Sequence, residues 1–406
     1  MDKARIYSLL KSNFNYVTQN GYEGYDPKIF DYMPFSSKTS FKPTFKNKVL
    51  RRLEIEIFRR KFPNLLIPYL NLCNINAKTT IPYGLGVFMQ CYAQMYRVEK
   101  NIEFLNEAKK VASIASDMLI PVKGGLGIPN PSNGKEVKYG DGIFNDSTAF
   151  LPGGSEVFFG FYNLYNITND KSYFQFCQQI ADGFINAFTL KHVSEEKWVF
   201  DYSNKGDNSH VLNANALGMS CLALMYKETK DEKYKNIVEK LYNYLEPYMH
   251  YENIPYAGIE DKKSNKSWFG CDAYHTGFTL RGMYETADIL NYDKTHIIKQ
   301  IKQMIMDFVI DDKIIVYKGI GQKGLHQDIH ALSEYIRIFS TFYDFFDESE
   351  KNLYKDLVMK NINDFILPDE SSYYYTVNRN KKFYLYMPRW SHGPMMNALS
   401  LLYDKI

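Results

Sequence analysis

Stretches dense in apolar residues recur along this chain at intervals of about 55 to 70 residues. They have helical length and open near Tyr83, Gly153, Asn213, Tyr274, Asp328 and Ser391. A short turn rich in Asn, Asp and Lys follows each of the earlier ones, and then a stretch with Lys and Glu on one helical face. A long loop with Gly, Asn, Asp and Tyr closes the unit. The pattern predicts repeated two-helix hairpins.

About six such units favour a closed ring over an open solenoid. The fold class is therefore all-α, an (α/α)6 toroid with apolar helices inside and amphipathic helices outside. We expect an irregular segment over 1–45, packed on the ring, and one toroid domain over 46–406, in which 46–72 supplies the sixth outer partner or a lead-in. The strand-like pieces at 197–202, 313–317 and 373–377 predict short β-hairpins in the loops.

The starts of the inner helices are the predicted functional site. A helix N-terminus leaves backbone N–H groups unpaired and carries a partial positive charge, which suits anionic or hydroxyl-rich ligands. His275, His330 and His392 recur at nearly the same point of the repeat, whereas the chain has only eight histidines. We expect His275, His330, Arg389 and His392 to converge on one pocket, because a ring brings all inner-helix starts to one rim.

Other side chains near these starts complete the candidate site. Tyr274 is a candidate acid or base, and Glu156 a candidate catalytic carboxylate, although acidic residues there also act as helix caps. Arg389 can grip a carboxylate and Trp390 can stack on a sugar face. The remaining candidates for substrate binding are Asp146, His210, Asn213, Trp268 and Asp272.

Composition narrows the functional class. The formal net charge of +3, from 49 basic and 46 acidic residues, gives no reason to expect nucleic-acid binding. Aromatic residues make up 16% of the chain, with 34 Tyr and 28 Phe, which suits sugar binding, although a coding bias would enrich Tyr in the same way.

Five scattered cysteines, no signal-peptide pattern and no long apolar run lead us to expect free thiols, no membrane span and a cytoplasmic protein. His326 and His330 bracket the sequence HQDIH, but no third metal ligand is evident. No metal or cofactor is therefore expected.

Four segments carry a family resemblance: GYDPKIFDYMPF, FRRKFPNLLIPYLNL, WFGCDAYHTGFTLRGMYE and MPRWSHGPMMNALSLL. They resemble the polysaccharide-biosynthesis proteins related to VpsJ of bacterial exopolysaccharide clusters, over most of the chain from about Gly24. More distantly, the chain is similar to α/α toroids that act on sugars, namely N-acylglucosamine 2-epimerases, unsaturated glucuronyl hydrolases and glucuronyl C5-epimerases. The resemblance implies a cleft for a saccharide, sugar phosphate or nucleotide sugar, and association with polysaccharide-assembly proteins.

Three functions stay open at this point. An epimerase or lyase acting on an acidic sugar needs a base, an acid and a cation, for which His275, His330 or Tyr274, and Arg389 are the candidates. A glycoside hydrolase needs paired carboxylates, which Glu156, Asp146, Asp272 and Asp328 could supply. A non-catalytic glycan-binding or assembly protein needs the cleft and the aromatic residues alone.

Overall fold

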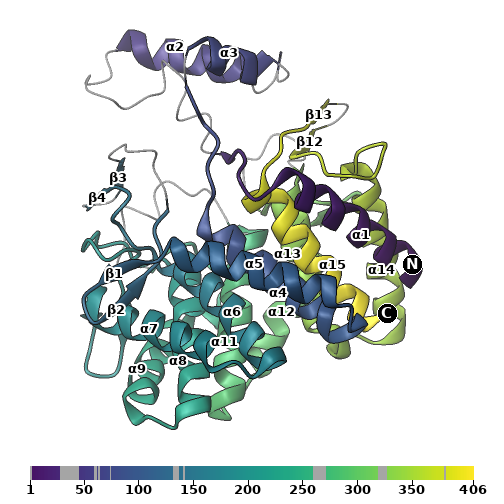
Figure 1. Ribbon diagram of the computed structural model, residues 1–406. Coiled ribbons are helices and arrows are strands. Elements are labelled where there is room, and N and C mark those ends of the chain that lie inside the picture. Colours follow the sequence, from purple (N-terminus) through teal and green to yellow (C-terminus); the bar gives the residue numbers. More distant parts are fainter. Residues whose placement is uncertain are drawn as a thin grey trace.

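A computed structural model describes residues 2–27, 45–58, 62, 65–73, 75–130, 137–139, 142–258, 271–318, 327–378 and 381–406. Within them, six helices form an inner layer in which each packs against the next and the last returns to the first (Figure 1). The predicted toroid is therefore confirmed. The inner helices are α4 (Pro82–Glu99), α6 (Leu151–Thr168), α8 (Leu212–Thr229), α11 (Ala273–Leu290), α13 (Ile329–Thr341) and α15 (Gly393–Lys405).

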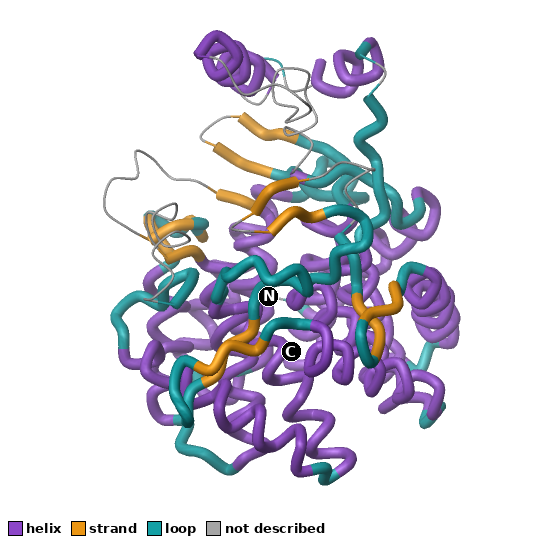
Figure 2. The backbone as a smooth tube through the Cα atoms, turned by 90° about the vertical axis from the view of Figure 1, so that its left-hand side faces the viewer, coloured by secondary structure: helices purple, strands orange, loops and turns teal. Residues whose placement is uncertain are grey.

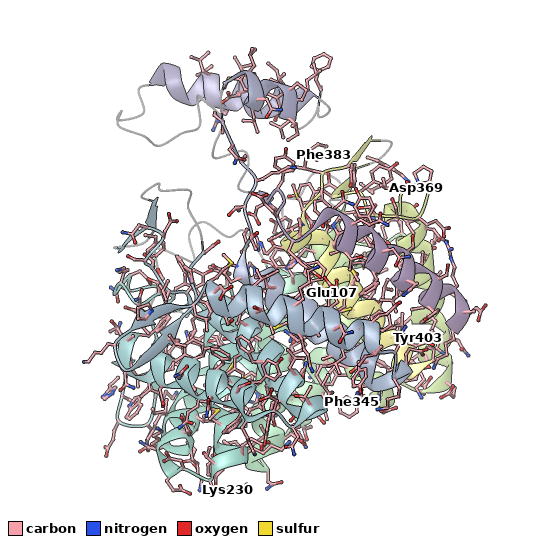
Figure 3. All side chains as sticks on the ribbon, viewed as in Figure 1. Glu107, Lys230, Phe345, Asp369, Phe383 and Tyr403 are labelled. Carbon is pink, nitrogen blue, oxygen red and sulfur yellow. The ribbon has the colours of Figure 1, made fainter. Side chains whose placement is uncertain are left out.

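The two layers differ in burial as their sequences predict. Every residue from Leu212 to Met225 in α8 is buried, because this helix is covered on all sides. The following outer helix buries one face only, as its apolar residues recur every three or four positions. The outer helices are α5 (Ile102–Asp117), α7 (Lys171–Ala187), α9 (Glu232–Leu245), α12 (Thr295–Asp307) and α14 (Glu348–Phe365). Side chains fill the space between the layers (Figure 3).

The same short turn joins inner to outer helix in three successive hairpins. Lys100, Asn169 and Lys230 end their helices in the left-handed region, with φ between 55° and 58°. The next residue, an Asn or Asp, caps the outer helix through its side chain. These turns explain the Asn- and Asp-rich signal in the sequence.

The N-terminal segment differs from the prediction. Residues 1–45 were expected to be irregular, yet α1 spans Lys3–Asn20, capped by Asp2, and packs against α15 as its outer partner. Its buried residues, Ile6, Leu9, Leu10, Phe14 and Val17, have helical spacing. The sixth outer helix, which we expected from residues 46–72, is therefore α1. Residues 45–72 instead hold α2 (Phe45–Glu56) and α3 (Leu66–Leu72), which stand clear of the ring in both views (Figures 1 and 2).

Strands are short and lie in the loops (Figure 2). The strand-like sequence pieces correspond to β6, to β9 with β10, and to β12, each paired antiparallel, so the predicted loop hairpins are confirmed. The strands are β1 (Ile120–Val122), β2 (Gly125–Gly127), β3 (Val137–Tyr139), β4 (Gly142–Phe144), β5 (Leu190–His192), β6 (Trp198–Phe200), β7 (Cys271–Asp272), β8 (Val309–Ile310), β9 (Lys313–Ile314), β10 (Tyr317–Lys318), β11 (Gln327–Asp328), β12 (Thr376–Asn378) and β13 (Lys381–Phe383).

Three single-turn helices, η4 (Glu246–His250), η5 (Tyr343–Phe345) and the π-helical η6 (Pro388–His392), complete the elements. No helix in the described ranges is long and apolar enough to span a membrane.

Inner helices approach closely at Gly86, where α4 meets α6. A Cβ there would lie 2.4 Å from the main-chain carbonyl of Glu156. We expect Gly86→Ala to lower the free energy of unfolding by roughly 1–3 kcal/mol, because the two backbones must move apart. Gly153→Ala is the matched control, since its Cβ would meet only Ile128, at 3.5 Å. Equal stability of the two variants in chemical denaturation would contradict this packing.

Candidate functional site

A cleft of about 480 Å³ lies at the end of the ring where the inner helices begin. Each inner-helix start contributes to its wall, so the repeat register predicted from the sequence is confirmed. The lining residues near these starts are Tyr83 on α4, Pro152 and Gly153 on α6, Asn213 on α8, Tyr274 and His275 on α11, His330 on α13, and Arg389 and Trp390 in η6 before α15.

Buried Asp272 and partly exposed His275 form a pair at the start of α11. The Asp272 carboxylate accepts the backbone N–H of His275 at 2.8 Å, as a helix cap, and its second oxygen lies 2.5 Å from His275 Nδ1. Because an ionised carboxylate only accepts hydrogen bonds, Nδ1 carries the proton and Nε2 is the nitrogen able to exchange a proton with a substrate. Asp272 is buried behind the histidine, and the His275 side chain is 20% exposed in the cleft.

His330 lines the same cleft in a different state. Its Nδ1 donates to the main-chain oxygen of Trp390 at 3.1 Å, and its ring stacks on the Trp390 indole with centroids 4.2 Å apart. Burial, with a smaller contribution from Arg389, lowers the pKa of His330 to about 3. The imidazole is therefore neutral near pH 7, and Nε2 can accept a hydrogen bond.

Arg389 is already paired. Its Nε donates to Asp26 Oδ2 at 2.7 Å and its Nη2 donates to the same oxygen. The guanidinium carbon lies 4.6 Å from the Trp390 ring centroid. One edge of the guanidinium is thus occupied and its charge is balanced, which argues against the predicted grip on a substrate carboxylate.

The rest of the cleft combines aromatic faces with an unpaired acceptor. Asn213 is buried, and its side-chain oxygen has no hydrogen-bond partner among the residues that the structure describes. A buried acceptor without a partner is costly, so a ligand hydroxyl at this place would be stabilising. Seven aromatic rings supply much of the remaining wall: Tyr83, Phe150, Tyr202, Tyr256, Tyr274, Phe278 and Trp390. This combination suits a sugar.

Glu156 lies deeper, in a layer of buried charges that crosses the ring. Its carboxylate accepts from Gln90 at 2.8 Å and lies 3.4 and 3.5 Å from the guanidinium nitrogens of Arg281 and Arg337. Burial alone would raise the pKa of Glu156, but Arg337 and Arg281 outweigh it, so the pKa is lowered. The predicted catalytic carboxylate is therefore an ionised part of the core and does not line the cleft.

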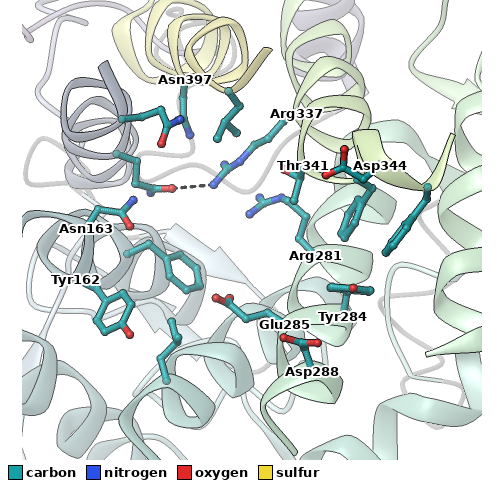
Figure 4. A pocket seen from close by; sticks show the side chains of 17 residues that line it. Tyr162, Asn163, Arg281, Tyr284, Glu285, Asp288, Arg337, Thr341, Asp344 and Asn397 are labelled. Atoms are coloured by element: carbon teal, nitrogen blue, oxygen red, sulfur yellow. Dashed lines mark hydrogen bonds between the residues drawn. The ribbon is translucent and has the colours of Figure 1, made fainter. Parts of the chain in front are cut away.

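The far side of this layer borders a second cavity of about 500 Å³, at the end where the inner helices finish. Figure 4 shows Arg281 and Arg337 pointing into it, with Arg337 donating to Gln90. The layer thus separates the two ends of the ring.

The structure places His210, Asp146 and Asp328 outside the cleft wall. His210 is buried and lies 3.5 Å from Asp201, and Asp146 is exposed in a turn. Asp328 caps α13 and accepts from the Trp390 indole at 3.0 Å, which fixes that ring. Trp268, like His326, lies outside the described residues.

His392 does not converge with the other three residues, contrary to the prediction. It is fully buried, with Nε2 2.5 Å from Ser372 Oγ and Nδ1 2.9 Å from Ser391 Oγ, and its ring stacks on Tyr16 of α1. Burial lowers its pKa to about 4. In the π-helical turn η6, Arg389 and Trp390 face the cleft, whereas His392 faces α1.

The two buried histidines, His330 and His392, predict a pH dependence of the free energy of unfolding. An unfolded chain binds their protons near the ordinary pKa of 6.5, whereas the folded chain resists protonation down to about 4 at His392 and about 3 at His330. The unfolded state therefore binds more protons in this window, and the free energy of unfolding should fall as the pH drops below about 6.5. Denaturation at about pH 7 and about pH 5 tests this. His392→Gln should lose less stability on acidification than the unchanged protein, and an equal loss would contradict the assignment.

Sequence reasoning missed Asp26 and most of the aromatic wall. Asp26 lies in the segment GYDP, whose role becomes visible only when the chain brings it to Arg389, 363 positions away. The sequence signal that could have indicated Asp26 is its carboxylate directly after two Gly-Tyr pairs, in GYEGYDP.

Comparisons with known proteins agree with this fold. The family model of Glycosyl hydrolase family 76 matches residues 155–312, which include Asn213 and His275 but end before His330 and Arg389. No curated protein sequence matches the chain. Together with the structural neighbours described next, the family match supports a carbohydrate-active enzyme, as two of the three functions left open by the sequence require.

Solved structures of sugar enzymes have the same architecture. A cellobiose 2-epimerase from Bacillus thermoamylovorans superimposes with a TM-score of 0.62 at 10% identity, covering 80% of this chain and 88% of that one. A sugar epimerase from a ruminal bacterium gives 0.60 at 12% identity, over 80% and 87%. An inactive α-1,6-mannanase variant from Salegentibacter, with two consecutive aspartates changed to asparagine and α-1,6-mannotriose bound, gives 0.55 at 12% identity, over 80% and 90%.

Proposed function

We propose that the protein transfers a proton at a sugar carbon next to a carbonyl group, as an epimerase-type enzyme. The Asp272–His275 pair carries the proposal. Asp272 fixes the tautomer and orientation of the imidazole, and His275 Nε2 removes the proton. The aromatic walls and Asn213 bind the sugar ring and its hydroxyls.

His330 and Tyr274 hold the substrate in this proposal. Burial raises the pKa of Tyr274 well above its ordinary value, so its hydroxyl stays protonated and can donate to the oxygen on which charge develops. Neutral His330 accepts a hydrogen bond from a sugar hydroxyl. His275 therefore both removes the proton, which exchanges with solvent, and returns a proton to the other face of the planar enediolate after that intermediate has turned in the cleft.

Hydrolysis is the second candidate, favoured by the family match. Among the described residues that line the cleft, Asp26 is the one carboxylate, and Arg389 occupies it. Consecutive aspartates occur in this sequence at Asp311–Asp312 alone. Asp312 is exposed at the β8–β9 turn, where it pairs with Lys360 of α14. The cleft thus shows no carboxylate pair across a scissile bond among the residues described.

The balanced charge of Arg389 favours a neutral sugar over the acidic sugar predicted from the sequence. A cytoplasmic role in surface-polysaccharide biosynthesis, related to VpsJ, with polysaccharide-assembly partners, is part of the same proposal.

Product analysis tests the proposal. Reducing mono- and disaccharides are incubated with the protein and separated by chromatography. We expect a new diastereomer of unchanged mass. Shortened saccharides would support hydrolysis instead, and binding without any product would leave a glycan-binding protein.

A further inference from the structure

The α2–α3 hairpin carries an unusual concentration of exposed apolar side chains. Thirteen large apolar residues are exposed in the described part of the chain, and seven of them fall between residues 49 and 72. They are Val49, Leu50, Leu53, Ile57, Phe62, Leu65 and Leu72, with exposed fractions from 38% to 83%. We call these seven residues the bare face. Such a concentration on one small hairpin marks an interaction surface.

The hairpin has an inner face of its own, so the bare face is not simply unfolded core. Phe58 stacks on Tyr69 with ring centroids 4.4 Å apart, and the Tyr69 hydroxyl donates to Glu54 at 2.7 Å. Glu54 is buried by this contact. Val49 and Leu53 of α2, and Ile57 directly after it, are spaced four apart and form a line that these contacts leave uncovered.

Charge indicates what covers the bare face. The sequence 45–61 contains seven Lys and Arg residues against two Glu, although the whole chain is nearly balanced. One of the two, Glu54, is turned toward α3. Basic residues beside an apolar helical face are typical of helices that lie on anionic membranes. Two copies of such a segment would repel each other, which disfavours a dimer through this face.

The chain leaves the ring before the hairpin, and rejoins it afterwards, beside the cleft. Gly24 and Thr79 pair with each other through two backbone hydrogen bonds, of 3.1 and 2.8 Å. This pair joins the two ends of the segment that contains the hairpin. Asp26 on the outgoing side and Ile81 on the returning side both line the cleft. The two points at which the chain leaves the ring toward the hairpin and returns from it therefore lie beside the cleft.

We propose that the bare face of the α2–α3 hairpin docks on an anionic membrane surface and so presents the cleft to saccharides carried at that surface. The apolar side chains enter the headgroup region, and the basic residues approach lipid phosphates. The docking itself does not depend on the proposed proton transfer, whereas the presentation of a saccharide rests on it.

Vesicle co-sedimentation of the full chain tests the docking. Vesicles of phosphatidylcholine alone are compared with vesicles containing phosphatidylglycerol, at low and high salt. We expect binding to the anionic vesicles that weakens with salt. The double variant Leu53→Glu/Ile57→Glu should bind at least about tenfold less, since it places two charges on the bare face.

The matched control is Met306→Glu/Leu353→Glu, which changes two exposed apolar residues on the outer layer, 54% and 64% exposed. It should bind like the unchanged protein, and so should His275→Ala, which separates docking from catalysis. Equal binding to both vesicle types, or unchanged binding of the hairpin variant, would overturn the proposal. So would light scattering that shows a dimer dependent on the hairpin, if that dimer binds neither vesicle type.

Discussion

Replacing His275 by alanine is expected to reduce sugar turnover by roughly 10²- to 10⁴-fold, the usual contribution of a positioned general base. The melting temperature should fall only slightly, because the ring is partly exposed in the cleft and Asp272 keeps the backbone N–H of residue 275 as its helix-cap partner. Steady-state kinetics with thermal unfolding of the same samples checks both parts.

Two further variants sharpen this prediction. Asp272→Asn keeps a good helix cap but removes the acceptor charge at Nδ1, so turnover should fall while the fold persists. His250→Ala is the matched control, since this histidine is 43% exposed outside the cleft. Full activity of His275→Ala would remove the base from the proposal.

The second large effect concerns stability. Glu156→Ala should lower the free energy of unfolding by about 3–5 kcal/mol, because it leaves two buried guanidinium groups, of Arg281 and Arg337, without their shared carboxylate. Chemical denaturation measures the change. Glu156→Gln keeps the shape of the side chain and loses its charge, so its free energy of unfolding should lie between those of Glu156→Ala and the unchanged protein.

A matched control for Glu156 is Glu232→Ala on α9, whose side chain is 73% exposed and which should unfold like the unchanged protein. If Glu156→Ala also unfolded like the unchanged protein, the layer of charges across the ring would not be a stabilising element.

The ring was predictable because the composition of each helix indicates whether the helix is buried on all sides or on one face only. An inner helix such as α8 is buried from Leu212 to Met225 and carries no charged residue there, whereas an outer helix such as α9 has apolar residues on one face and charged residues on the other. α1 was not predicted, because the irregular Gly- and Pro-containing sequence that follows it dominates residues 1–45, although Ile6, Leu10 and Val17 have helical spacing.

The candidate site was predictable only as far as the repeat fixes position. His275, His330 and Arg389 reach one cleft because the register of the repeat places them at one rim. What each does depends on distant partners: Asp26 neutralises Arg389, and burial neutralises His330. The spacing of residues along the sequence reveals neither the Asp26–Arg389 pair nor the burial of His330.

Side-chain direction explains the two misplaced candidates. His392 follows Trp390 in the sequence, yet the π-helical turn points it at α1. Glu156 lies one turn below the start of α6, where guanidinium groups from α11 and α13 meet it. Both positions require the packed ring to be known.

Solvent-deuterium incorporation tests the central claim, that His275 exchanges a proton with a sugar carbon. The reaction is run in D₂O with a sugar that the protein converts, and the product is analysed by proton NMR. We predict deuterium at the carbon whose configuration changes, and none in the same sugar incubated with His275→Ala. A product that gains no solvent deuterium at carbon, or deuterium incorporation that persists in His275→Ala, would contradict the account.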